Sequence, residues 1–230
     1  MAHRCARKFR LGSLLRSCNA SKQKGISAVR VFLALLTIAF SGCSMYMSQR
    51  VGTWTEGMSK NTVYRFLNNQ RINWERLMTE LAARAVSFLE PLTSEERINT
   101  YIVDDTMYPR DRSDQSELLS RVYDHNPGKY HKGYRGLTLG WSDGSTFIPV
   151  NAALLASGDD SKVVGPISEC DGRTLASRRR KRARTKGTQV MADMLHEAKK
   201  QTCLLSISCL TPGSSPVLLL QLCGNRRVST

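Results

Sequence analysis

Apolar and polar positions alternate most clearly between Ile98 and Ala156. The run Tyr101–Thr106 is apolar and β-branched until it ends in two carboxylates, which is typical of a buried strand that delivers an acid at its C-terminal end. Because side chains alternate along a strand, Asp104 should lie on the same face as Ile102, and Asp105 on the opposite face.

Further strand patterns follow this run. Residues Leu118 to His125 predict a second strand, and extended structure resumes at Tyr130 after a turn with Pro and Gly. Residues Leu137 to Val150 form two β-rich arms around a Ser-Asp-Gly turn, a strong hairpin signal because Gly144 can adopt positive φ. These strands predict an α/β chain with a mixed sheet.

Helical patterns flank the predicted sheet on both sides in the sequence. Upstream, an apolar run lies within 26–47, a short amphipathic helix begins near Ser59 or Asn61, and a further one begins at Trp74. Downstream, 188–200 carries an apolar stripe at helical spacing.

The net charge of the chain indicates the class of molecule that it binds. The 230 residues carry a formal charge of +15, which favours a polyanion such as nucleic acid or an anionic membrane. Residues Met1 to Lys24 contain no Asp or Glu and predict a disordered arm, either contacting DNA phosphates or serving as a leader without a role. The seven scattered cysteines form no C-x-x-C pair, which argues against a zinc ribbon and fits a reducing cytosol.

The apolar run within 26–47 allows two interpretations. Upstream basic residues and the sequence Phe40-Ser41-Gly42-Cys43 resemble an export signal with a lipoprotein cleavage box. The uninterrupted run is, however, about half the length that spans a bilayer. We therefore favour a buried helix of a helical region and expect no membrane partner.

Two stretches carry a family resemblance: VDDTMYPRDRSDQSELLSRVYDH and KGYRGLTLGWSDGSTFIPVNAALLAS. They resemble insertion-sequence transposases of the DDE class, in the IS-four group, and the similarity runs from about Gly25 to Lys200. The resemblance implies an RNase H-like core preceded by an all-α DNA-binding region. It also implies a site in which three acids hold two Mg²⁺ ions.

The resemblance identifies Asp104 as the first catalytic acid and metal ligand, because Thr106 follows at the offset common in the family. Asp105 remains the alternative. The family's second acid lies in a D-S-W-F tetrapeptide that this chain lacks, and its last acid, a glutamate, is expected beyond the final residue.

Basic residues supply the predicted DNA contacts. Lys60, Tyr64 and Arg65 lie on the outer face of the helix that begins near Ser59, which suits the recognition element of a helix-turn-helix unit, although an ordinary packing helix has the same pattern. A dense cluster, expected to be disordered or docked on phosphate, adds Arg178, Arg179, Arg180, Lys181, Arg182, Arg184 and Lys186.

The sequence changes character after Lys200. Residues 201–230 contain no Asp or Glu, and helical periodicity stops. If each codon is read as the last base of one codon plus the first two of the next, Thr211 to Ser214 permit Asp-Ser-Trp-Phe. These three changes at one place predict a frameshift near Lys200.

The sequence therefore predicts four regions: a basic disordered arm (1–25), a helical DNA-binding domain (26–97), part of an RNase H-like domain (98–200) and an out-of-frame disordered tail (201–230). The predicted function is that of a cytoplasmic, truncated and inactive transposase that retains binding to duplex DNA at element terminal repeats; self-association is left open. The alternatives are a regulatory or competitor DNA-binding product and, last, a membrane-anchored basic protein.

Overall fold

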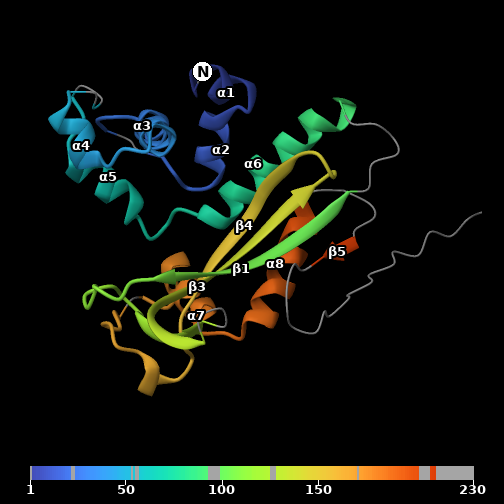
Figure 1. Cartoon of the computed structure of the whole chain (residues 1–230). Helices are drawn as coiled ribbons and strands as arrows, with labels where there is room; N and C mark the ends of the chain where they lie inside the picture. The colour runs from blue at the N-terminus through green and yellow to red at the C-terminus, as the bar shows by residue number, and fades with distance from the viewer. Residues whose placement is uncertain are drawn as a thin grey trace, which may run out of the picture. The chain divides into compact units, whose positions relative to one another are not determined.

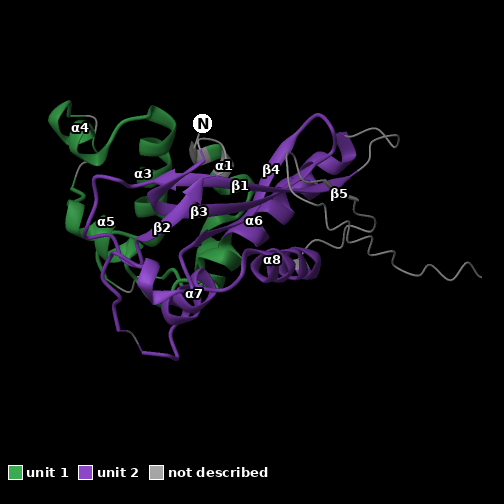
Figure 2. Ribbon diagram, turned by 60° about the horizontal axis from the view of Figure 1, so that its bottom comes forward, with its two compact units in different colours: residues 1–77 green, residues 78–230 purple. Residues whose placement is uncertain are grey.

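The computed structural model describes residues 2–21, 24–52, 54, 57–92, 99–124, 128–169, 171–201 and 208–210. The chain forms two compact units, Met1–Leu77 and Met78–Thr230, and the boundary falls within a helix (Figures 1 and 2). None of the helices in the described part is both long and apolar enough to cross a membrane.

The described elements of the first unit are helices, of which the last continues into the second unit (Figure 1). They are α1 (Ala2–Lys8), α2 (Leu11–Ser17), α3 (Ala28–Ser41), α4 (Met45–Arg50), α5 (Lys60–Leu67) and α6 (Trp74–Leu89). The expectation of a disordered arm over 1–25 is wrong for α1 and α2, because Leu11, Leu14 and Leu15 bury their side chains. Three leucines on one face of a short helix stabilise it through packing that composition does not reveal.

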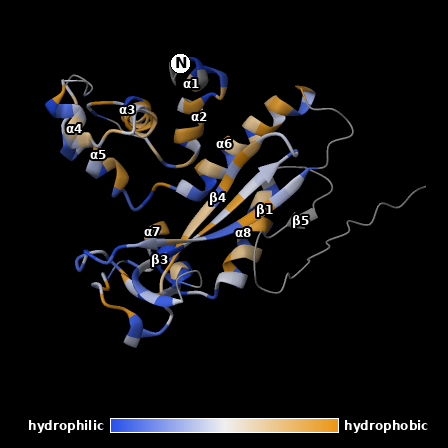
Figure 3. Ribbon diagram, in the orientation of Figure 1, coloured by the Kyte–Doolittle hydropathy of each residue, from blue (hydrophilic) through white to orange (hydrophobic). Residues whose placement is uncertain are grey.

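Local signals set the ends of α3. The Ser27 side chain accepts a hydrogen bond from the Arg30 amide at 3.3 Å, and Gly42 ends the helix with a φ of 65°. The helix is largely hydrophobic (Figure 3), and it buries Val31, Leu33 and Ala34.

The second unit has the mixed α/β class that the sequence predicts, with a largely antiparallel sheet and helices. Its elements after α6 are a 3-10 turn at Glu90–Leu92, β1 (Thr100–Pro109), β2 (Ser120–Asp124), β3 (Lys129–Ser142), β4 (Phe147–Leu155), a 3-10 turn at Asp160–Lys162, α7 (Leu175–Ala183), α8 (Gly187–Gln201) and β5 (Ser208–Leu210). The predicted strands, hairpin and final helix are confirmed.

The long strand β3 organises the sheet. It pairs antiparallel with β1, β2 and β4, and the order along the main path is β2-β3-β1-β5. The β3–β4 hairpin turns at Asp143 and Gly144, where Gly144 has a φ of 89° and a buried Asp143 carboxylate accepts from the Ser145 and Thr146 amides.

One face of the sheet carries the core of the second unit. Tyr101, Val103, Leu139 and Trp141 pack into a cluster to which α6 and α8 contribute. In Figure 2, α6, α7 and α8 lie on one side of the strands. The stripe predicted on α8 is buried there, because Val190 is fully buried, Met194 nearly so, and Leu195 lies in the same cluster.

Two expectations for the C-terminal part change. The basic cluster is not disordered: its residues from Arg178 to Arg182 lie in α7, which begins where the Thr174 hydroxyl accepts from the Ser177 amide at 3.1 Å. In the tail, Ser208–Leu210 forms β5 parallel to β1, so the expected disorder is wrong there. Residues 202–207 and 211–230 lie outside the described part of the chain.

Candidate functional site

The two adjacent carboxylates sit near the middle of β1, where the strand leaves the core. Tyr101 and Val103 are buried, whereas Asp104, Asp105 and Thr106 are exposed. Asp104 pairs with Thr138 of β3, and Asp105 pairs with Leu137. Since a strand alternates its side chains, the carboxylates of Asp104 and Asp105 project from opposite faces of the sheet.

Asp105 forms an ion pair with an arginine of the neighbouring strand. The Arg135 guanidinium donates to both carboxylate oxygens, with the Nε–Oδ1 distance at 3.2 Å. Arg135 lies on the neighbouring strand β3, opposite Met107 and two positions along from Leu137, which pairs with Asp105. A two-pronged contact of this kind is a strong, directional charge-assisted hydrogen bond.

Asp104 has a different environment. Its Oδ2 accepts a hydrogen bond from the Thr106 hydroxyl at 2.8 Å, on the same strand face. This contact leaves the carboxylate with further lone pairs for a cation, because an ionised carboxylate has about four acceptor sites. The predicted two-residue offset between Asp104 and Thr106 thus corresponds to a direct contact.

The sheet face around Asp104 is open and bears aromatic rings. A methyl group on Gly136 would come within 2.0 Å of the Tyr108 ring, and one on Gly140 within 2.1 Å of the Phe147 ring, so each ring lies over a glycine. Both Tyr108 and Phe147 are exposed, as is Leu154. The acid therefore stands on an accessible surface.

Strand β5 lies beside the strand that bears the acids. Its three residues pair in parallel with Thr100, Tyr101 and Ile102, and Leu210 is the partner of Ile102. The carboxyl ends of parallel neighbours point the same way, so the chain leaves β5 two residues short of the level of Asp104. The acid-bearing strand β1 therefore has β3 on one side and the parallel strand β5 on the other.

The donor set does not fit a two-ion centre. Among the described residues, no three His, Cys, Asp or Glu side chains come together in a way that could hold a metal ion. Asp104 and Asp105 are on opposite faces, and Asp105 is paired with Arg135. Mg²⁺ is octahedral and usually takes one or two protein carboxylates per ion, so two ions need more acids than these residues offer.

The predicted DNA contacts on α5 differ in exposure. Ser59, not Asn61, caps this helix, because its hydroxyl accepts from the Thr62 amide at 3.3 Å. Tyr64 and Arg65 are exposed, whereas Lys60 is half-buried with its ammonium 5.3 Å from the centre of the Tyr46 ring. Lys60 is thus engaged within the first unit by a cation–π contact.

Arg180, in the basic cluster, has a structural role. It forms a two-pronged ion pair with Glu117, with the Nη2–Oε2 distance at 2.8 Å. The hydrogen bond from Arg180 holds the pKa of Glu117 below its ordinary value, although partial burial opposes the shift. Arg180 therefore ties α7 to the loop that precedes β2.

Arg184, which directly follows α7, contacts the loop after β4. Its guanidinium donates to the carbonyls of Ser157 and Gly158 at 3.3 and 3.0 Å, and also pairs with Asp160. Arg179 and Arg182 are half-buried. The cluster members that remain exposed to solvent are Arg178, Lys181 and Lys186.

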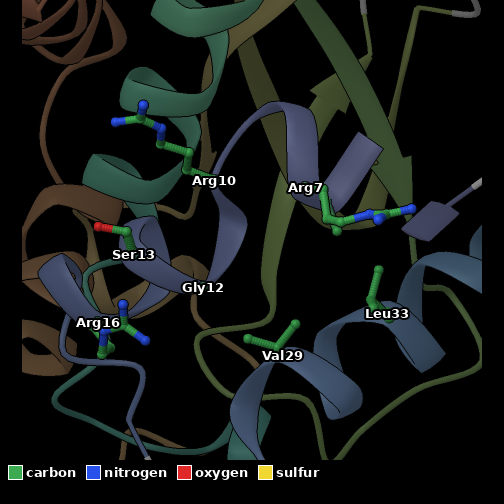
Figure 4. Close-up of a pocket in the computed structure, with 8 residues that line it drawn as sticks. Arg7, Arg10, Gly12, Ser13, Arg16, Val29 and Leu33 are labelled. Carbon is green, nitrogen blue, oxygen red and sulfur yellow. The ribbon is translucent and has the colours of Figure 1, made fainter. Parts of the chain in front are cut away.

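Sequence reasoning missed Arg135 as the partner of Asp105, because the two are 30 residues apart and meet only through the register of β1 and β3. It also missed a pocket in the first unit lined by arginines of α1 and α2, including Arg7 and Arg16 (Figure 4). The absence of Asp and Glu from the N-terminal region indicates a basic surface there. It does not predict which of the arginines line a common pocket.

Comparison with known proteins identifies the family to which the chain belongs. A comparison with curated protein sequences gave no match. The family model described as DDE superfamily endonuclease matches residues 29–213, which include β1 with both acids, the β3–β4 hairpin and β5. The match spans most of the 230 residues, and members of this superfamily are nucleases that act on DNA, generally with divalent metal ions. The chain therefore belongs to the DDE superfamily endonuclease family.

Proposed function

We propose that the chain is an insertion-sequence transposase product, of the IS-four group, that binds duplex DNA and neither cuts nor joins it. The observation that carries this proposal is that, among the described residues, no second and third acid gather around Asp104. The family's chemistry needs several carboxylates around two Mg²⁺ ions, and a single available carboxylate is too few.

The contrast between the two carboxylates supports Asp104 as the retained acid. Asp105 already has a cationic partner in Arg135, and a Mg²⁺ ion would have to displace that guanidinium. Asp104 accepts from Thr106 on an open face and has room for a hard cation. Asp105 remains the alternative.

The position of β5 supports a lost reading frame. In the alternative frame, the Asp codon of Asp-Ser-Trp-Phe takes the last base of the Leu210 codon and the first two bases of the Thr211 codon, at the end of the strand paired with β1. An aspartate there would stand at the end of a parallel neighbour of the acid-bearing strand. The printed frame has instead no Asp or Glu from 201 to 230. We therefore place the disruption near Lys200.

Surface charge supports retained DNA binding. The chain carries a formal charge of +15, and cations stand exposed on α7 and just beyond it at Arg178, Lys181 and Lys186. Each cation that neutralises a phosphate releases counterions and steepens the salt dependence of binding. A product of this kind would compete with an intact transposase for element ends, and we place it in the cytoplasm.

The catalytic part of the proposal is tested on supercoiled plasmid. The full chain, its Asp104→Ala variant and its Asp105→Ala variant are incubated with Mg²⁺ or Mn²⁺, and nicked and linear DNA are quantified. We expect no nicking above the protein-free control. Metal-dependent nicking that disappears in Asp104→Ala would overturn inactivity, and nicking that disappears only in Asp105→Ala would also overturn the choice of acid.

The binding part is tested with a labelled duplex over a range of salt. We expect the logarithm of the binding constant to fall linearly with the logarithm of salt. The triple variant R178Q/K181Q/K186Q should have a slope reduced by about 3. A matched triple, K129Q/K162Q/R173Q, removes three exposed cations elsewhere and should change it less. Equal slopes for the two triples would remove the contact role of α7.

A further inference from the structure

We propose that the exposed face at the far end of the β2–β3 hairpin binds unpaired bases of single-stranded DNA. Tyr123 and Tyr130 would stack on the bases, and Arg121 would contact a backbone phosphate; we call these three residues the tyrosine face. Such a site goes beyond the duplex binding proposed above, because it takes DNA in another state and lies on a surface outside α5 and α7. All three residues belong to the second unit.

The far end of the hairpin extends past the rest of the sheet. Strand β2 pairs with residues Lys129 to Gly133 of β3, which lie beside it in Figure 2. Strands β1 and β4 pair with β3 only from Gly133 and Arg135 onward. Within the described sheet, the first residues of β3 therefore have β2 as their one ladder partner, and the side chains there have few neighbouring strands to cover them.

Two tyrosines meet across this end of the hairpin. Tyr123 and Tyr130 are direct partners in the register, with ring centroids 5.2 Å apart and ring planes at 63°. In an edge-to-face pair, one ring covers only one face of the other. Tyr130 is 62% exposed and Tyr123 is 41% exposed, so both present ring surface to the solvent.

An exposed arginine lies on the same face as the two rings. Arg121 and Tyr123 are exposed, whereas Val122 between them is buried, as alternation along a strand requires. In the register Arg121 faces Lys132, whose ammonium pairs with the Asp114 carboxylate at 2.6 Å. The nearby Asp114 thus has a cationic partner of its own, and Arg121 supplies a positive charge beside the rings.

This combination fits unpaired DNA better than a duplex. In a duplex the bases stack on one another and present edges and phosphates, whereas an unpaired base can stack on an aromatic ring. Aromatic rings next to a cation are the elements with which proteins bind single strands. The formal charge of +15 favours a polyanion, and the family acts on DNA. Asp124, which follows Tyr123, lies on the opposite face by alternation.

Two double variants separate stacking from hairpin stability. Tyr123→Leu/Tyr130→Leu removes both rings and keeps apolar side chains at the paired positions. Tyr123→Phe/Tyr130→Phe keeps the rings and removes only the hydroxyls. Phe40→Leu is the matched control, because Phe40 is an 85% exposed aromatic residue of α3 in the first unit.

The test compares two labelled ligands of the full chain. One is a thymidine oligonucleotide of about 20 nucleotides, longer than the site of a typical single-strand-binding domain. The other is an abasic oligonucleotide of the same length, with the same phosphates and no bases. The ratio of their affinities reports the contribution of the bases. This ratio does not depend on the folded fraction, because both ligands meet the same protein.

We expect the wild type to bind the thymidine oligonucleotide about twentyfold more tightly than the abasic one, as two stacked bases would give. The leucine double variant should bring the ratio close to equality. The phenylalanine double variant and Phe40→Leu should keep the wild-type ratio. Arg121→Gln should lower the salt slope for the thymidine oligonucleotide by about 0.7, and the matched Arg30→Gln, at an exposed position of α3, should lower it less.

Cross-linking locates the stacked bases. With 5-iodouracil in place of thymine, ultraviolet light should join the oligonucleotide to Tyr123 or Tyr130, as mapped by mass spectrometry of the cross-linked peptides. Cross-links confined to other aromatic residues would overturn the tyrosine face.

The outcomes separate this site from the proposed function. Equal wild-type affinities for the two oligonucleotides, or a ratio unchanged in the leucine double variant, would overturn the tyrosine face and leave duplex binding standing. Base-dependent binding that the leucine variant loses, without any binding of duplex, would support the tyrosine face and remove the duplex proposal. Tighter binding of a uridine oligoribonucleotide than of the thymidine oligonucleotide would overturn the assignment to DNA.

Discussion

Neighbouring residues of the same type acquire different roles from their surroundings. Asp104 and Asp105 are adjacent, yet one accepts from a threonine hydroxyl on the open face and the other from an arginine of the next strand. The basic cluster divides in the same way, since Arg180 pairs with Glu117 while Lys181 next to it is exposed. Chemical type limits what a side chain can do, and the partner within reach decides what it does.

We predict that Arg180→Ala destabilises the second unit and that Lys181→Ala does not. The first change leaves the half-buried Glu117 carboxylate without its guanidinium partner and should cost about 1–3 kcal/mol. Urea unfolding of both variants and the wild type measures the difference. Equal unfolding midpoints for the two variants would contradict the structural role of Arg180.

The same pair predicts a dependence on pH. The folded-state pKa of Glu117 is lowered by Arg180, so the pair's stabilisation is present above the ordinary pKa of 4.5 and is lost as the pH falls through the lower folded-state value. The difference in unfolding free energy between wild type and Glu117→Gln should therefore shrink as the pH is lowered below about 4.5. A difference that stays constant to pH 3 would exclude this linkage.

At the scale of elements, the stability of the sheet depends on how closely neighbouring strands approach each other as well as on the hydrophobic pattern. In β3, a methyl group on Gly133 would lie 2.3 Å from the Tyr108 carbonyl oxygen, which the β1–β3 pairing fixes in place. On Gly136, the obstacle is the Tyr108 ring, an exposed side chain that can rotate away. The two glycines look alike in the sequence and have different consequences.

We therefore predict that Gly133→Ala destabilises the sheet by about 1–3 kcal/mol, as overpacking against an immobile neighbour does. Gly136→Ala should cost less, because the Tyr108 ring can move. Gly172→Ala is the matched control, since a methyl group there meets no atom within 4 Å. Thermal unfolding of the three variants tests the order, and a Gly136→Ala cost as large as that of Gly133→Ala would contradict it.

At the scale of the whole molecule, the chain matches a nuclease family, yet its described residues do not assemble a metal site. The match extends through residue 213, yet the described residues hold no metal-binding cluster of three His, Cys, Asp or Glu. In the described part of the chain, β5 is the last strand and lies beside the acid-bearing strand, and the sequence contains no Asp or Glu after it. The frame disruption that we propose would account for both observations.

We predict that the gene carries such a disruption close to the codons for Lys199 to Thr202. Sequencing the DNA from codon 195 onward tests this directly: the alternative frame should read Asp-Ser-Trp-Phe from the last base of the Leu210 codon and continue open. Immediate stop codons, or a different tetrapeptide, would remove the explanation, and the tail would then be genuine protein.

The sequence alone determined the features that depend on neighbours along the chain. Alternation predicted β1 and the faces of Asp104 and Asp105, the Ser-Asp-Gly turn predicted the hairpin, and an apolar stripe predicted α8, because local geometry fixes these periods. The sequence offers Ser59 and Asn61 as N-cap residues of α5. In the structure the Ser59 hydroxyl accepts the capping hydrogen bond from the Thr62 amide.

The tertiary structure decided what depends on residues far apart in sequence. Pairing of β1 with β3 brought Arg135 to Asp105, and packing of α7 took Arg180 and Arg184 into ion pairs. The leucines of α2 folded a stretch that composition predicted to be disordered. Charge density along a chain shows that cations are present, but only the packed fold determines which of them carboxylates neutralise and which face the solvent.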